Sequence, residues 1–142
     1  MKTLLTILMI TVFTTPAFAE EGWGELNGMG LECEITDKKY ERDEELKYFV
    51  FEKGEVYWLV VTDGTPAKIN KLSHGRYFTS ANDVRWYPYI LNKKTLRLDK
   101  LRPTYPSRQH DCEIKEPKQI EAILHKKTDE LKERMKDNKI EK

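Results

Sequence analysis

From residue 29 to residue 36, apolar and polar side chains alternate strictly, and Cys33 belongs to the apolar set. A period of two with acidic residues on the other face is typical of a half-buried β-strand. Two aromatic and β-branched runs, 46–51 and 56–61, flank a short turn that contains Gly54, which favours a β-hairpin. Residues 84–91 are also strand-like, but Pro88 lies among them and indicates an edge strand or a bulge.

Weaker strand signals complete the pattern before residue 116. Residues 65–74 favour at most a short strand, with a break at His74-Gly75, and residues 76–78 could begin another. Residues 95–98 pair with the 84–91 run, and a last short strand surrounds Cys112. We therefore predict a mainly β protein (α+β by count). Its six to eight short antiparallel strands form a small meander, a sandwich or a partly closed barrel.

The hydrophobic period changes at Pro117, which suits the first turn of a helix. Apolar residues then recur at helical spacing, and this predicts one C-terminal amphipathic helix over 116–137, with a frayed tail at 138–142. Packing across one end of the sheet is the simplest role for this helix. A dimerising coiled coil and a partner-binding helix are the alternatives. The apolar positions are Ile120, Ile123, Leu124, Leu131 and Met135.

The first 19 residues have the organisation of a secretory signal peptide. Lys2 is followed by an apolar run from Leu4 to Phe13, then by Pro16 and by Ala17-Phe18-Ala19 at the expected cleavage site. The apolar run is shorter than the ~20 residues that span a bilayer. We expect cleavage after Ala19, a periplasmic or secreted product with no membrane span, an irregular lead-in over 20–28 and a β domain over 29–115.

The chain has two cysteines, Cys33 near the start of the β domain and Cys112 near its end. An exported chain meets an oxidising compartment, so we predict an intramolecular disulfide that closes the β domain. Two buried thiols and an intermolecular bridge are the alternatives. Two lone cysteines do not suggest a zinc site.

Charge is segregated along the chain. Residues 20–63 hold 13 acidic and 5 basic residues, a net charge of −8, whereas residues 68–108 hold 10 basic and 2 acidic residues, a net charge of +8. The basic stretch also carries tyrosines. The alternation assigns Val84, Trp86 and Ile90 to the core. The candidate binding face consists of Arg85, Tyr87, Tyr89, Lys93, Lys94 and Arg97.

Such a face suits an anionic envelope polymer or the acidic surface of another exported protein, whereas nucleic acid is not expected. In the alternative arrangement, basic and acidic strands lie side by side and their charges cancel. No catalytic, metal-binding or cofactor-binding motif is present, although a triad could be drawn from Ser73, His74 or His110 with an aspartate. We therefore expect a non-enzymatic binding or structural protein without a cofactor, with an enzyme of unknown class as one alternative.

The chain resembles small exported bacterial β proteins over residues 29–114, on the segments Leu31-Glu32-Cys33, 89–98 and Cys112. A more distant similarity is to the MliC family of periplasmic lysozyme inhibitors, which insert a Ser-Gly-x-x-Tyr loop into the lysozyme cleft. Ser73-His74-Gly75-Arg76-Tyr77 keeps the Ser-to-Tyr spacing with the glycine displaced. This resemblance implies, as a further alternative, inhibition of a secreted hydrolase through an inhibitor loop that carries Ser73 and Tyr77.

Overall fold

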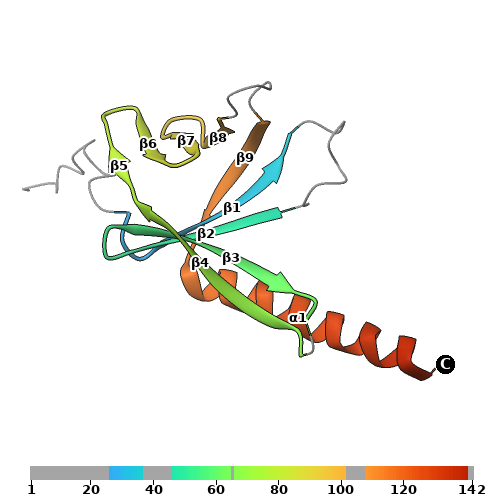
Figure 1. Ribbon diagram of the computed structural model, residues 1–142. Coiled ribbons are helices and arrows are strands. Elements are labelled where there is room, and N and C mark those ends of the chain that lie inside the picture. The colour runs from blue at the N-terminus through green and yellow to red at the C-terminus, as the bar shows by residue number, and fades with distance from the viewer. Residues whose placement is uncertain (1–25, 37–45, 65, 102–107, 141–142) are drawn as a thin grey trace, which may run out of the picture.

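The computed structural model describes residues 26–36, 46–64, 66–101 and 108–140. Within these residues the chain forms nine antiparallel strands in a nearly closed, barrel-like sheet, followed by one helix (Figure 1). The predicted fold class is confirmed. The strands and the helix are β1 (Met29–Ile35), β2 (Leu46–Glu52), β3 (Glu55–Thr62), β4 (Lys68–Arg76), β5 (Phe78–Thr79), β6 (Asp83–Trp86), β7 (Tyr89–Asn92), β8 (Arg97–Lys100), β9 (Arg108–Lys115) and α1 (Pro117–Ile140).

The sheet consists of two meanders. Its order is β4-β3-β2-β1-β9-β8-β7-β6-β5, so β1 to β4 pair in sequence and so do β5 to β9. The ladder between β1 and β9 joins the two meanders in the middle of the sheet. The single residue Tyr77 connects β4 at one edge to β5 at the other. The two edges therefore approach each other, and we call this region of approach the seam.

The interior of the barrel is one aromatic and aliphatic core. Phe49 and Phe51 are fully buried, and the ring centroid of Trp86 lies 5.4 Å from that of Phe49 and 5.5 Å from that of Phe51. These ring pairs meet edge to face, which is a favourable arrangement for aromatic side chains. The other buried members are Leu26, Leu31, Cys33, Val56, Val84, Tyr89, Leu91 and Leu98.

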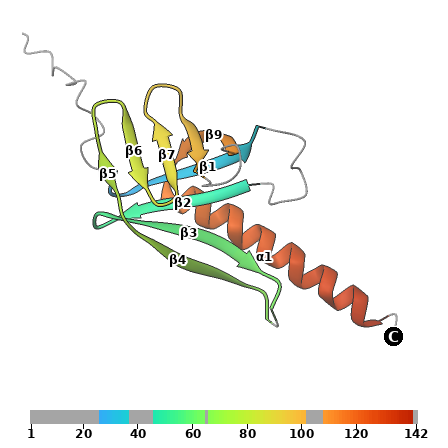
Figure 2. The same cartoon turned by 45° about the horizontal axis from the view of Figure 1, so that its top comes forward.

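The outer face of β1 to β4 is covered by α1 (Figure 2). The amphipathic helix packs on the sheet as expected, but on this face rather than across one end. Ile120 and Leu124 pack on Tyr48 and Val50 of β2. Gly30 of β1 permits the close approach of the helix, because a Cβ atom at this position would lie 2.4 Å from Ile120 Cδ1. The helix then continues past the end of the β3–β4 hairpin (Figures 1 and 2).

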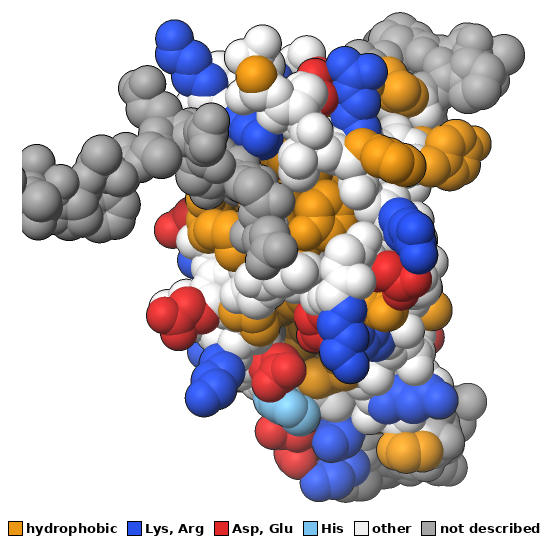
Figure 3. Space-filling model, turned by 90° about the vertical axis from the view of Figure 1, so that its left-hand side faces the viewer, with side chains coloured by type: hydrophobic (Ala, Val, Ile, Leu, Met, Phe, Trp, Pro, Cys, Tyr) orange, Lys and Arg blue, Asp and Glu red, His pale blue; other side chains and the backbone are white. Residues whose placement is uncertain are grey.

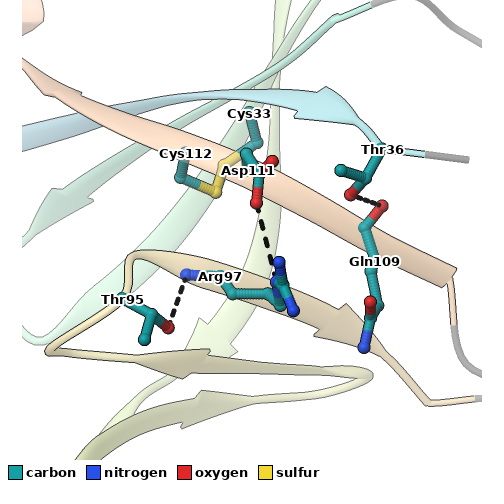
Figure 4. Close-up of a disulfide and its surroundings, with 7 residues drawn as sticks. All are labelled: Cys33, Thr36, Thr95, Arg97, Gln109, Asp111 and Cys112. Atoms are coloured by element: carbon teal, nitrogen blue, oxygen red, sulfur yellow. Dashed lines mark hydrogen bonds and ion pairs between the residues drawn. A yellow bond between two sulfur atoms is a disulfide. The ribbon is translucent and has the colours of Figure 1, made fainter.

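The predicted cysteine pair is present. Cys33 of β1 and Cys112 of β9 are direct cross-strand partners, with their Cα atoms 4.0 Å apart and their sulfur atoms joined at 2.10 Å (Figure 4). Cys33 is fully buried in the interior core. The disulfide therefore lies on the one ladder that joins the two meanders.

Two strand predictions need correction. Residues 65–74 were expected to give a short, weak strand with a break at His74-Gly75, whereas β4 runs from Lys68 to Arg76 because it pairs with β3. At His74-Gly75 the strand continues, with a shift of its register against β3. Residues 84–91 were expected to form one strand, whereas the chain turns at Tyr87-Pro88 and gives β6 and β7. The Tyr87–Pro88 peptide bond is cis.

The helix also extends further than predicted, to Ile140, so the backbone of residues 138–140 is helical rather than frayed. The predictions for the signal peptide and for most of the lead-in lie outside the described residues.

Candidate binding site at the seam of the barrel

A hollow of about 370 Å³ opens at the seam, where the end of β4 passes the turn between β6 and β7. We call it the seam groove. This volume lies within the ~300–1,000 Å³ range of small-molecule sites. The side chains around it are mainly aromatic and aliphatic. It is lined by His74, Arg76, Phe78, Arg85, Trp86, Tyr87, Pro88, Tyr89, Ile90 and Leu101.

The floor of the seam groove belongs to the interior core. Trp86 and Tyr89 are direct cross-strand partners at the turn, and both are buried. The ring centroids of Tyr89 and Phe49 are 5.3 Å apart, and the imidazole of His74 meets both rings at an angle, at 5.9 and 6.1 Å. These contacts hold the floor rigidly, because each ring is packed against at least one other.

The rim of the seam groove exposes large apolar side chains to solvent. Tyr87 is 85% exposed, Phe78 73% and Leu101 51%. A scattered exposed apolar residue is ordinary in a soluble protein, whereas several around one hollow are typical of interaction surfaces. Figure 3 shows the side of the molecule on which β5 lies, where hydrophobic side chains are exposed beside those of lysine and arginine.

Three polar side chains complete the seam groove. Arg85 is held by Asp83 through two contacts of 2.9 Å, and this guanidinium keeps the pKa of the Asp83 carboxyl below its usual value. His74 Nδ1 lies 3.2 Å from the carbonyl oxygen of Tyr87, which accepts a hydrogen bond when Nδ1 carries the proton. Arg76 also lines the seam groove, is exposed to solvent and has no ion pair with a described residue.

The seam groove contains part of the face predicted from the sequence. Arg85 and Tyr87 are exposed on it, as expected. The assignment of Tyr89 to the exposed face is wrong, because Tyr89 is 5% exposed and packs in the core, whereas Ile90 lies on the same outer row as Arg85. The chain reverses in a two-residue turn at Tyr87-Pro88. Beyond this turn the inward and outward positions are exchanged, so Tyr89 faces inward and Ile90 outward.

The remaining basic residues of the predicted face do not join the seam groove. Lys93 and Lys94 lie in the turn at the far end of β7, where the amine of Lys93 donates to the carbonyl oxygen of Ser80. Arg97 points toward Asp111 on β9, with Nε 3.6 Å from Oδ1 (Figure 4). The alternative in which basic and acidic strands lie side by side therefore holds for Arg97.

The expected inhibitor loop is also different in the structure. Ser73 lies within β4, and its hydroxyl accepts a hydrogen bond from the backbone N–H of Gly75. Tyr77 is half-buried, with its ring 5.2 Å from that of Phe51. The segment from Ser73 to Tyr77 is thus a strand end that packs on the core, and it does not protrude as a loop.

Sequence reasoning missed Arg76, Phe78 and Leu101, which belong to the seam groove. The run Arg76-Tyr77-Phe78 was a usable signal, since it places a cation and two aromatic rings together inside the basic stretch. Leu101 gave no comparable signal. It reaches the seam groove because its backbone N–H donates to the carbonyl oxygen of Pro88, which extends the pairing of β7 with β8 by one residue.

A second polar cluster lies inside the barrel, apart from the seam groove. His110 is 1% exposed, and its Nδ1 has no hydrogen-bond partner among the described residues. Burial lowers the pKa of His110, and the positive charge of Lys47 lowers it further. Lys47 is itself buried, with its amine 5.1 Å from the ring centroid of Trp58. This cluster favours a neutral imidazole in the folded state.

Comparisons with known proteins add no assignment: no protein family model, no curated protein and no solved structure matches this chain. In the described part of the chain, no group of three or more histidine, cysteine, aspartate or glutamate residues is placed to hold a metal ion. No helix among those residues is both long and apolar enough to cross a membrane. The seam groove is therefore the feature on which a functional proposal can be built.

Proposed function

We propose that the chain is an exported, non-enzymatic binding protein and that the seam groove is its binding site. The observation that carries this proposal is the concentration of Phe78, Tyr87 and Leu101, all mostly exposed, around one hollow of about 370 Å³. Keeping these side chains in water has a free-energy cost that binding of an apolar group would remove. Exposure of these three side chains adds nothing to the stability of the folded chain on its own.

The polar groups of the seam groove favour a ligand that is also anionic. Arg85 is already neutralised by Asp83, whereas Arg76 makes no ion pair with a described residue; the carboxylate of its cross-strand neighbour Glu55 accepts a hydrogen bond from Tyr57 instead. A guanidinium beside an apolar hollow binds carboxylate, sulfate or phosphate groups well, because it offers several donors in one plane. The ligand therefore combines an aromatic or aliphatic part with an acid.

The residues that line the seam groove suit binding better than catalysis. The polar groups that line the seam groove are two guanidinium groups, the His74 imidazole, the Trp86 indole N–H and two tyrosine hydroxyls. The Asp83 carboxylate is paired with Arg85 and does not itself line the groove, and no thiol of a described residue lines it. A hydrolytic or transfer reaction needs a nucleophile and a base in mutual contact. The seam groove offers a rigid aromatic floor and a cation, and these groups orient a ligand without transforming it.

Two features support export. The first 19 residues have the pattern of a signal peptide, and Cys33 and Cys112 lie at disulfide distance, which is rare in proteins that stay in the cytosol. We place the protein in the periplasm or outside the cell. Ligands available there include acidic envelope polymers and other exported proteins.

The dye 8-anilinonaphthalene-1-sulfonate tests this proposal, since it joins an aromatic part to a sulfonate. We expect saturable, one-to-one binding by the native protein at pH 7, seen as increased dye fluorescence. Phe78→Ser and Arg76→Glu should each weaken dye binding by at least about threefold. This loss of affinity corresponds to only a fraction of the free energy that one buried side chain or one ion pair contributes. Near-ultraviolet circular dichroism must show intact tertiary packing, because loosely packed states also bind this dye.

Two matched variants control for general effects of the substitutions. Ile114→Ser removes another exposed apolar side chain, on β9, and Lys94→Glu makes the same change of charge at the far end of β7. Both should leave dye binding unchanged. Absence of saturable binding, or an equal loss in the control variants, would exclude the seam groove as the binding site.

A further inference from the structure

The seam groove continues into a free strand edge. β4 is the first strand in the order of the sheet and pairs only with β3 among the described residues. The backbone N–H and C=O groups on its other side have no partner strand there. β4 has nine residues, and its part ahead of the seam, before His74, is long enough to accept another extended chain, whose main chain supplies alternating donors and acceptors.

The side chains of β4 select the charge of such a partner. β4 contains Lys68, Lys71 and Arg76 and no acidic residue. Lys71 is already paired with Glu52, whereas Lys68 and Arg76 have no ion pair with a described residue. Two copies of β4 would place cations opposite cations, which disfavours self-pairing. An acidic strand would instead meet complementary charge at both ends of β4.

The apolar positions of β4 lead toward the seam groove. Leu72 is 45% exposed, and His74, two residues later on the same strand, lines the seam groove. Alternate residues of a strand share one face, so Leu72 and His74 lie on the same face of β4; the register with β3 then shifts at His74-Gly75. A strand added along β4 would therefore pass Leu72 and end at the seam groove. An apolar side chain at the end of that strand would enter the seam groove.

We infer that β4 binds an extended, acidic segment of another protein chain, which adds to the sheet as a further strand and places an apolar side chain in the seam groove. This inference rests on the proposed function of the seam groove and names the class of its ligand. A polysaccharide or polyphosphate would satisfy the cations. It would not satisfy the row of backbone donors and acceptors, which calls for a polypeptide.

A fluorescein-labelled ten-residue peptide in which valine alternates with glutamate is a suitable probe. We expect saturable binding by fluorescence anisotropy, and slower amide hydrogen exchange in β4 when the peptide is bound. The same peptide with every second backbone nitrogen methylated on the pairing edge should bind at least about tenfold more weakly, since several backbone hydrogen bonds are lost. A peptide with lysine in place of glutamate should not bind.

Variants of the protein separate this inference from the proposed function. Lys68→Glu should weaken peptide binding about 3- to 10-fold, as expected for reversal of one exposed charge, and should leave binding of the aromatic sulfonate dye unchanged. Lys94→Glu is the matched control and should change neither. If the dye binds and the peptide does not, the strand-addition inference fails while the seam groove stands as a binding site.

The remaining outcomes also decide the question. Equal binding of the methylated and unmethylated peptides, or equal competition by dextran sulfate, would show that charge alone is recognised, and strand addition would be excluded. Slower exchange in β4 that accompanies charge-dependent and methylation-sensitive binding would support it. If neither the dye nor the peptide binds, both the seam groove and the strand edge are excluded as binding sites.

Discussion

Substitution of Gly30 by alanine tests how closely α1 packs on the sheet. The added Cβ atom would lie 2.4 Å from Ile120 Cδ1 and 2.9 Å from the carbonyl oxygen of Lys115. Ordinary carbon–carbon contacts are about 3.5–4.0 Å, so the helix would have to move away by at least ~1 Å. The Lys115 oxygen is backbone and cannot rotate away. We expect Gly30→Ala to lower the free energy of unfolding by ~1–3 kcal/mol, the usual cost of overpacking.

A double-mutant cycle isolates the steric cause. Ile120→Val deletes Cδ1 and alone should cost about 0.5–1.5 kcal/mol. Because the deleted atom is the one that the new Cβ would strike, the double variant should be more stable than the sum of the two single effects, by ~0.5 kcal/mol or more. Urea unfolding followed by tryptophan fluorescence measures all four proteins. The m-value shows whether the extent of unfolding has changed.

Gly64→Ala is the matched control. Gly64 is exposed, and a Cβ atom there would meet no atom nearer than the Pro66 carbonyl oxygen, at 3.8 Å. This variant should be neutral or slightly stabilising, because alanine reduces the freedom of the unfolded chain. Strict additivity between Gly30→Ala and Ile120→Val, or an equal loss in Gly64→Ala, would refute the close approach of α1 to β1.

Three further predictions concern stability. The pKa of His110 is lowered in the folded state, so the unfolding free energy has its full value above the unfolded pKa of ~6.5 and declines as the pH falls from there through the lower folded pKa. His110→Gln should remove this dependence in thermal melts between pH 7 and 5, and His125→Gln, at an exposed position, should keep it. Replacement of Cys33 and Cys112 together by serine should lower the unfolding free energy by about 4–5 kcal/mol, because the disulfide closes a loop of 79 residues in the unfolded chain. The midpoint of urea unfolding measures this loss, and an unchanged midpoint would contradict the prediction. Lys53 has φ +52° in the tight β2–β3 turn, so Lys53→Asn should stabilise by ~0.5–1 kcal/mol in urea, whereas a loss would count against that turn geometry.

Much of the fold could be predicted because local pattern and tertiary structure agree. Strict alternation identified β1, the aromatic runs identified the β2–β3 hairpin, and the change of period at Pro117 identified α1. The full length of β4 could not be read in this way. Its sequence has little alternation, and it is a strand because β3 supplies its hydrogen bonds.

The candidate site was less predictable for a geometric reason. The assignment of Tyr89 to the surface assumed one strand from 84 to 91, and a two-residue turn inside that run reverses which side chains face inward. In the seam groove, Phe78, residues 85–90 and Leu101 are brought together by neighbouring strands, whereas His74 and Arg76 of β4 join them only when the sheet curls until its two edges approach. No periodicity in the sequence encodes that closure.

The division of the sheet into two meanders has a consequence for how the chain folds. Of the eight strand ladders in the described residues, seven join strands that follow one another directly, and only the ladder between β1 and β9 joins distant parts of the chain. Short-range pairings form quickly, whereas distant ones need a costly loop closure first. The disulfide lies on that one slowly formed ladder, so in an oxidised chain the distant strands β1 and β9 are already held together when folding begins. Refolding from urea should therefore be faster with the cysteines joined than with them reduced.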